Sequence, residues 1–107
     1  MSHNLLSVAR CESMTEVRQH IDALDDRIVA LLAERSAYVA QAARIKPSAD
    51  KIVDHPRIEF IIDRVRRQAR EAGAPEPVIE AAYRALIAAS IDFERVEFAR
   101  IREGAAS

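Results

Sequence analysis

One long helix is the feature that most constrains what this chain can fold into. Ser13 and Glu16 form a capping pattern at its start, and Pro47 ends it because the residue before a proline is driven out of helical geometry. The predicted helix therefore has about 32 residues and a length of roughly 48 Å. A compact domain of this size has a radius of gyration of only about 13 Å. The helix is too long for the rest of its own chain to cover its apolar side, so an oligomer is implied.

A cation interrupts the apolar stripe of this helix. The stripe follows the four-and-three spacing of helices that pack on other helices: Val17, Ile21, Leu24, Ile28, Leu31, then Tyr38, Ala42 and Ile45. Arg35 occupies the position between, and a guanidinium on a core stripe is costly unless an anion meets it. Lys46, eleven residues later, falls within about 20° of the same face. Two inward cations over Val39 and Ala42 predict a pocket for a small acid inside a helical bundle.

Composition narrows the class of protein. Half of the 107 residues are hydrophobic but only 5% are aromatic, and no alternating β-branched run occurs, so one all-α domain is expected. A formal net charge of −1 gives no pull toward nucleic acid or anionic membrane. No apolar run approaches the roughly 20 residues that span a bilayer, and no signal peptide is recognised, so a cytoplasmic location is expected. Cys11 is alone, which predicts neither a disulfide nor a metal site.

Two further helices follow a polar connection at residues 47–55. Asp54 is a plausible N-cap for the second helix, which ends at Gly73. The third helix is predicted from about Pro77 to Arg102. We therefore expect a helical domain at residues 13–103, a flexible N-terminal tail at 1–12 and a short C-terminal tail at 104–107.

Polar residues also interrupt the inward stripe of the third helix. Ser90 and Glu94 lie one turn apart, and either Phe93 or Glu94 faces inward. Glu94 is the natural partner for the cations of the first helix. The ordinary alternatives are a structural ion pair between Arg35 and Glu94, and a solvated Lys46 favoured by the helix dipole.

Arg18 cannot reach the same pocket within one chain. It precedes Arg35 by seventeen residues, which is about 25 Å along the helix, and it points roughly 100° away. Taken alone it is an ordinary surface arginine. An antiparallel partner helix, however, could deliver it to the pocket.

The order of these residues resembles the all-helical (AroQ-type) chorismate mutase family. The pattern that carries the resemblance is Val17-Arg18-x-x-Ile21-Asp22-x-x-Asp25-x-x-Ile28-x-x-Leu31-Leu32-x-x-Arg35, then Lys46, Asp54-x-x-Arg57 and Ser90-x-x-x-Glu94. It extends over about residues 14 to 102. The resemblance implies three helices (long, short, long) per chain in an intertwined helical-bundle homodimer with two equivalent pockets.

The resemblance also implies a role for each matching residue. Arg18 matches an arginine supplied by the partner chain, whereas Arg35 and Lys46 match the cations that hold the carboxylates and the ether oxygen of the substrate. Arg57 and Asp54, at the start of the second helix, match substrate-contacting residues. On the third helix, Ser90 matches a small polar residue, and Glu94 stands where many members carry Gln. The implied reaction, the rearrangement of chorismate to prephenate, needs no cofactor or metal.

Two positions depart from the mutase pattern. Glu94 can donate a hydrogen bond to the ether oxygen only when it is protonated, so activity is expected to rise toward acidic pH. Ile58 stands where many mutases have a Glu that holds the ring hydroxyl of the substrate, and this replacement resembles the isochorismate-pyruvate lyases. The predicted function is therefore chorismate mutase, with an isochorismate-pyruvate lyase as one alternative. A non-catalytic helical dimerisation or regulatory module is the other.

Overall fold

The computed structural model describes residues 8–106 as an all-helical chain. Helices α1 (Met14–Ile45) and α3 (Glu76–Ala106) are long, helix α2 (His55–Ala72) is shorter, and a short 3₁₀ helix, η2 (Ala49–Lys51), lies between α1 and α2. No strand occurs within the described range. The predicted all-α class and the long, short, long order are confirmed. Predictions that concern residues 1–7 and 107 fall outside the described part of the chain.

The predicted helix ends are set by their capping residues. The Ser13 side chain accepts a hydrogen bond from the backbone N–H of Glu16 at 3.2 Å, which satisfies a donor left over at the start of α1. The Asp54 side chain accepts one from the backbone N–H of Arg57 at 3.0 Å and caps α2. Gly73 ends α2 with a φ of 70°, a left-handed conformation that favours glycine. These caps confirm the ends predicted from the sequence.

One helix boundary and the character of one connection differ from the prediction. Helix α3 continues to Ala106 rather than ending near Arg102, so residues 104–106 belong to the helix and are not a tail. The single Gly104 weakens a helix by only about 1 kcal/mol, and the alanines after it are the strongest helix formers. The connection at 47–55 is not wholly polar either, because Ile52 is buried.

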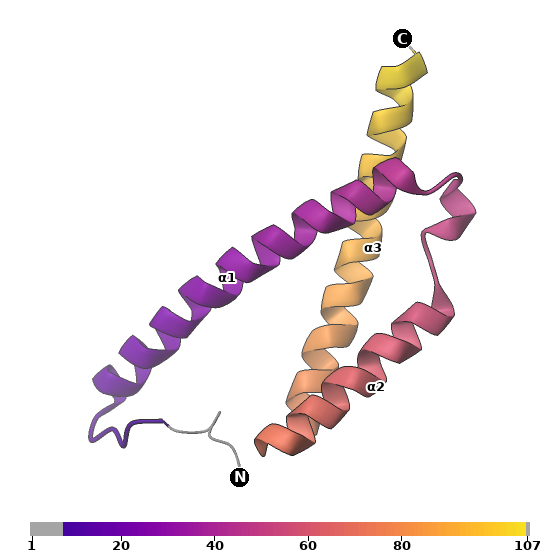
Figure 1. Ribbon diagram of the computed structural model, residues 1–107. Coiled ribbons are helices and arrows are strands. Elements are labelled where there is room, and N and C mark those ends of the chain that lie inside the picture. The colour runs from indigo at the N-terminus through magenta and orange to yellow at the C-terminus, as the bar shows by residue number, and fades with distance from the viewer. Residues whose placement is uncertain (1–7, 107) are drawn as a thin grey trace.

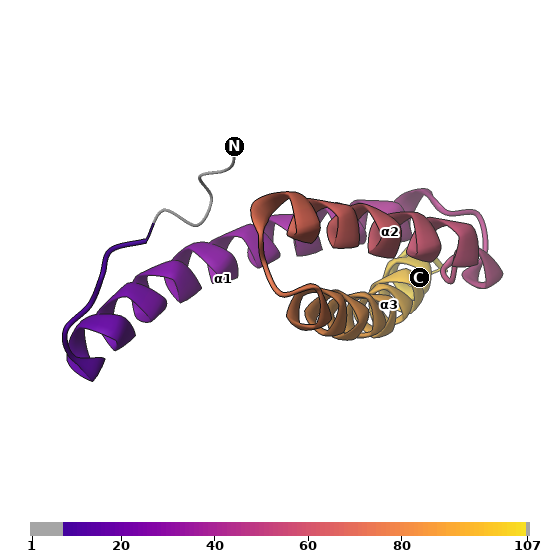
Figure 2. The same cartoon turned by 90° about the horizontal axis from the view of Figure 1, so that it is seen from below.

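Helix α3 is the element against which the other two pack (Figure 1). Helix α2 runs back along the lower part of α3, and the C-terminal part of α1 crosses its upper part (Figures 1 and 2). The N-terminal part of α1 projects away from both. The radius of gyration is 17.8 Å, which exceeds the value of about 13 Å for a compact domain of this length.

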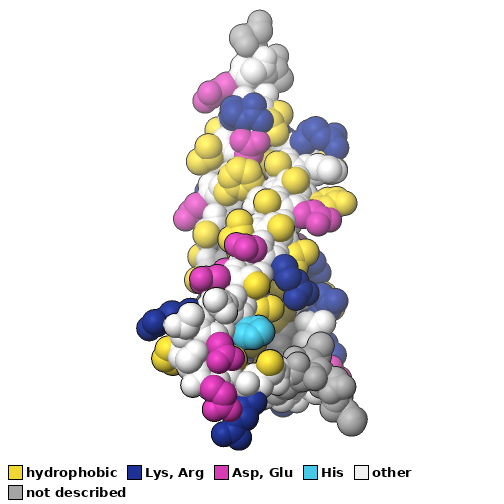
Figure 3. Space-filling model, turned by 90° about the vertical axis from the view of Figure 1, so that its left-hand side faces the viewer, with side chains coloured by type: hydrophobic (Ala, Val, Ile, Leu, Met, Phe, Trp, Pro, Cys, Tyr) yellow, Lys and Arg dark blue, Asp and Glu magenta, His cyan; other side chains and the backbone are white. Residues whose placement is uncertain are grey.

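The apolar core is small and lies where the three helices meet. It consists of Ala43, Ile52, Ile62, Val65, Ala69 and Ile87. Much of the apolar stripe of α1 is outside it: Ile21 and Leu24 are each 49% exposed, and Leu31 is 63% exposed. Figure 3 shows hydrophobic side chains along this side of the molecule. The described helices lack the combined length and apolarity that a membrane span needs.

Candidate functional site

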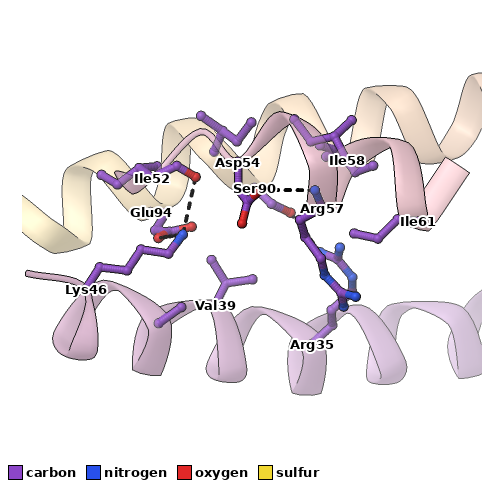
Figure 4. A pocket seen from close by; sticks show the side chains of 13 residues that line it. Arg35, Val39, Lys46, Ile52, Asp54, Arg57, Ile58, Ile61, Ser90 and Glu94 are labelled. Carbon is purple, nitrogen blue, oxygen red and sulfur yellow. Dashed lines mark hydrogen bonds and ion pairs between the residues drawn. The ribbon is translucent and has the colours of Figure 1, made fainter. Parts of the chain in front are cut away.

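A pocket of about 370 Å³ lies between the C-terminal half of α1, the start of α2 and the middle of α3 (Figure 4). The residues that line it are Arg35, Val39, Ala42, Lys46, Ile52, Asp54, Arg57, Ile58, Ile61, Ile87, Ser90, Ile91 and Glu94. All the predicted site residues except Arg18 are among them. The helices therefore bring together residues that are up to 59 positions apart in the chain (Arg35 to Glu94).

Arg35 lies toward one end of the pocket and is held there by Ser90 (Figure 4). Its Nη1 donates a hydrogen bond to the Ser90 Oγ at 3.0 Å, between α1 and α3. A guanidinium has five N–H donors in a planar fork, so one bond to a hydroxyl orients it and leaves it able to bind a carboxylate through two bonds. Arg35 is paired with a neutral hydroxyl, which argues against the simple Arg35–Glu94 ion pair.

Lys46 and Glu94 lie toward the other end of the pocket (Figure 4). The Lys46 Nζ is 2.7 Å from the Glu94 Oε2, and it also donates a hydrogen bond to the backbone carbonyl of Ile52 at 3.3 Å. The Glu94 side chain is only 8% exposed. Phe93 is 39% exposed, so Glu94 is the inward residue of the two candidates. The Lys46 ammonium is therefore held by two groups, the Glu94 carboxylate and the Ile52 carbonyl.

One oxygen of Glu94 keeps unused hydrogen-bonding capacity. Its Oε2 is buried and, within the described part of the chain, makes no hydrogen bond of acceptable angle. The short contact with Lys46 is therefore a close ion pair rather than an aligned hydrogen bond. Buried polar atoms are nearly always hydrogen-bonded in folded proteins, and exceptions are often found at functional sites. The unsatisfied oxygen therefore marks this end of the pocket as a candidate functional site.

The start of α2 forms the rim of the pocket. Asp54 and Arg57 are both exposed there, and the Arg57 guanidinium lies 5.2 Å from the centre of the Phe60 ring. Asp54 is an N-cap, as the sequence indicated, and it also lines the pocket. Ile58 is half-buried and adds an apolar side chain to the wall.

The floor of the pocket is more apolar than Val39 and Ala42 alone indicated. Four isoleucines complete it: Ile52, Ile61, Ile87 and Ile91. The sequence did not predict Ile61, Ile87 or Ile91 as pocket lining. Ile52 was missed, although it begins the only adjacent apolar pair in residues 47–55. An apolar floor lowers the local dielectric constant and strengthens the interactions of the charged groups above it.

Arg18 does not line this pocket. It is exposed on the N-terminal part of α1, which projects away from α2 and α3 (Figure 1). This agrees with the distance argument that Arg18 cannot reach the pocket of its own chain.

Sequence reasoning missed the role of Arg102. Its Nη1 and Nη2 donate hydrogen bonds to the backbone carbonyls of Ala43 and Lys46 at 2.7 and 2.5 Å, and its Cζ lies 3.6 Å from the centre of the Phe98 ring. The only local signal is the spacing of Phe98 and Arg102, which places an aromatic ring and a cation one helical turn apart.

Glu97 and Arg100 form a charged pair on α3 that does not line the pocket. Hydrogen bonds from Arg100, at 2.9 Å to each carboxylate oxygen, lower the pKa of Glu97. The same bonds raise the pKa of Arg100. Arg100 is exposed and Glu97 is half-buried, and the two are three residues apart on the same helix, so this is an ordinary local surface interaction.

Comparison with known proteins shows the family to which the chain belongs. Residues 17–95 match the family described as chorismate mutase type II. The chorismate mutase of Methanocaldococcus jannaschii is 32% identical over 68 residues, which are 63% of this chain and 69% of that protein. The isochorismate pyruvate lyase of Pseudomonas aeruginosa is 31% identical over 96 residues, which are 90% of this chain and 94% of that protein. With its three-helix fold and its cationic pocket, this chain belongs to the AroQ-type, or type II, chorismate mutase family.

Proposed function

We propose that this chain catalyses the rearrangement of chorismate to prephenate. The observation that carries the proposal is the grouping of Arg35, Lys46 and Glu94 around one apolar-floored pocket. The match to the chorismate mutase family supports the same substrate.

Arg35 binds a carboxylate of the substrate in this proposal. Ser90 already orients its guanidinium, so little conformational entropy is lost when a bidentate pair forms. Arg57 at the rim adds positive charge. Fixing a flexible dicarboxylate in a folded, chair-like shape brings the reacting carbons together and removes much of the entropic barrier.

Lys46 and Glu94 act at the breaking bond. In the rearrangement one C–O bond of the ether breaks while one C–C bond forms, and negative charge develops on the ether oxygen. The Lys46 ammonium and a protonated Glu94 both donate hydrogen bonds to that oxygen in the transition state. No nucleophile is required. Because Glu94 and Ile52 hold Lys46 before substrate binds, the donor is preorganised.

We further propose that the active form is an intertwined homodimer. The exposed apolar stripe of α1 is the surface that a second copy would bury, and the projecting end of α1 carries Arg18. In an antiparallel arrangement of the two α1 helices, the partner's Arg18 would approach the pocket and bind the second carboxylate. Each site would then contain residues from both chains.

An isochorismate-pyruvate lyase is the second candidate. Two observations favour it: the apolar side chain of Ile58 in the pocket wall, and the similarity to the Pseudomonas aeruginosa lyase over 90% of this chain. The same cations would hold isochorismate, and the products would be salicylate and pyruvate.

Parallel turnover assays test the proposal. Purified protein is given chorismate or isochorismate at mildly acidic and at neutral pH, and prephenate, salicylate and pyruvate are quantified. Prephenate from chorismate, formed faster in acid, is the expected result. Salicylate and pyruvate from isochorismate, without prephenate, would establish the lyase instead. No product from either substrate would leave only a non-catalytic helical module.

A further inference from the structure

Arg102 connects the last turns of α3 to the point where Lys46 enters the pocket. Its two terminal nitrogens donate to the carbonyls of Ala43 and Lys46, at 2.7 and 2.5 Å. The two acceptors lie in the final turn and at the C-cap of α1. Arg102 and Lys46 are 56 residues apart in the sequence, so this contact is made only by the folded chain.

The end of α1 needs such a donor. The last carbonyls of a helix have no partner within the helix, and Lys46 leaves helical geometry with φ −60° and ψ 136°. Pro47 follows and cannot continue the helix. A cation at this end also opposes the negative pole of the helix dipole. Arg102 supplies both the charge and two donors in a rigid plane.

Arg102 is itself held in place. Its guanidinium lies 3.6 Å from the centre of the Phe98 ring, one turn earlier on α3, and its side chain is half-buried. Stacking of this kind restricts a long side chain that otherwise samples many rotamers. Arg102 can therefore act as a fixed support rather than as a solvated surface charge.

Helix α3 therefore contacts Lys46 at two groups, the backbone carbonyl and the side-chain ammonium. Arg102 fixes the backbone carbonyl, and Glu94, eight residues earlier on the same helix, fixes the ammonium at 2.7 Å. An error of 1 Å in the position of a catalytic group can cost about a hundredfold in rate. Loss of the Arg102 contact with the Lys46 backbone would therefore shift the Lys46 ammonium in the pocket.

We infer that Arg102 is a positioning residue that sets the place of Lys46 in the pocket by clamping the end of α1. It does not line the pocket, and it acts through Lys46. The inference rests on the proposed function, because it concerns how the pocket binds its ligand.

The test compares ligand binding in two backgrounds. A bicyclic dicarboxylate that mimics the transition state is titrated by calorimetry into the wild type, Arg102→Gln and Arg102→Lys, and into the same variants made in Lys46→Ala. Arg102→Lys keeps the positive charge but loses the planar guanidinium that donates to both carbonyls. It is the milder change if Arg102→Gln does not fold. Arg100→Gln is the matched control, because Arg100 is an exposed arginine of the same helix that pairs only locally with Glu97. Thermal melting confirms that each variant is folded.

A positioning role predicts a loss that depends on Lys46. We expect Arg102→Gln to weaken binding by about tenfold when Lys46 is present and by less than about twofold in Lys46→Ala, as for residues coupled in a mutant cycle. Arg102→Lys should lie between, and Arg100→Gln should bind like the wild type. Equal losses in both backgrounds, or no loss at all, would overturn the inference. Failure of the wild type itself to bind would overturn the proposed function, and the inference with it.

Discussion

Lys46 and Glu94 lie 2.7 Å apart across α1 and α3, with the carboxyl side chain almost wholly buried. The Glu94 Oε2 makes no aligned hydrogen bond among the described residues, so the pair is close but incompletely satisfied. An ether oxygen beside the pair could accept a hydrogen bond from the Lys46 ammonium and, when the carboxyl is protonated, from Glu94.

Removal of the ammonium should nearly abolish turnover. We expect Lys46→Ala to lower kcat by about a hundred- to a thousandfold, the usual cost of losing one preorganised donor to developing negative charge. The control is Lys51→Ala, since Lys51 is an exposed lysine of η2 outside the pocket. Steady-state assays of both variants check this, and equal activity in the two would exclude Lys46 from the chemistry.

The pH profile should depend on Glu94. A carboxyl donates a hydrogen bond only in its protonated form, and protonation increases as the pH falls, so mutase activity should rise toward acidic pH. The charged groups that line the same pocket are Arg35 and Lys46 from α1 and Asp54 and Arg57 from α2.

The amide of a Glu94→Gln variant donates at every pH, so its kcat profile should be flat from mildly acidic to mildly basic pH. The comparison is made between kcat profiles of the wild type and Glu94→Gln in the same buffers. A wild-type kcat that is constant over this range would rule out the role of a protonated Glu94.

Mixing two inactive variants tests the shared site. If each pocket combines Arg35 of one chain with Arg18 of its partner, Arg18→Ala and Arg35→Ala should each lose activity in both pockets. A mixed dimer places both substitutions in one pocket and leaves the other intact. Random reassociation of equal amounts should then recover up to about a quarter of wild-type activity, because half the dimers of a two-fold assembly are mixed.

The mixing experiment uses refolding of the two variants together, with each refolded alone as the control. No recovery from the mixture, when each variant refolds as a dimer, would show that Arg18 does not act across the interface.

The local features of the fold could be read from the sequence because they depend on neighbouring residues. Ser13 and Asp54 cap their helices through residues three positions away, and Gly73 ends α2 through its own backbone. Arg35 could be identified as a site residue because an apolar stripe makes a cation conspicuous. Ser90 and Glu94 stood out for the same reason on α3.

Features that depend on contacts between helices could not be read in this way. The Ser90 hydroxyl orients Arg35, which lies 55 residues earlier in the sequence. Arg102 donates hydrogen bonds to carbonyls at the end of α1 that lie 56 and 59 residues earlier. Ile52 is buried in the connection after α1, and no neighbouring residue in the sequence indicates this. The end of α3 was placed too early, at about Arg102, whereas the helix continues to Ala106.

The most direct test of the central claim is the kcat/KM of Arg35→Ala for chorismate, measured beside its thermal melting curve. Arg35 holds a carboxylate in this account, and its Nη1 donates a hydrogen bond to the Ser90 Oγ on α3 at 3.0 Å. We expect kcat/KM to fall by at least about a hundredfold while the protein still melts cooperatively, since a charged pair in the transition state is lost. Wild-type activity in Arg35→Ala would contradict the assignment of this pocket as the active site.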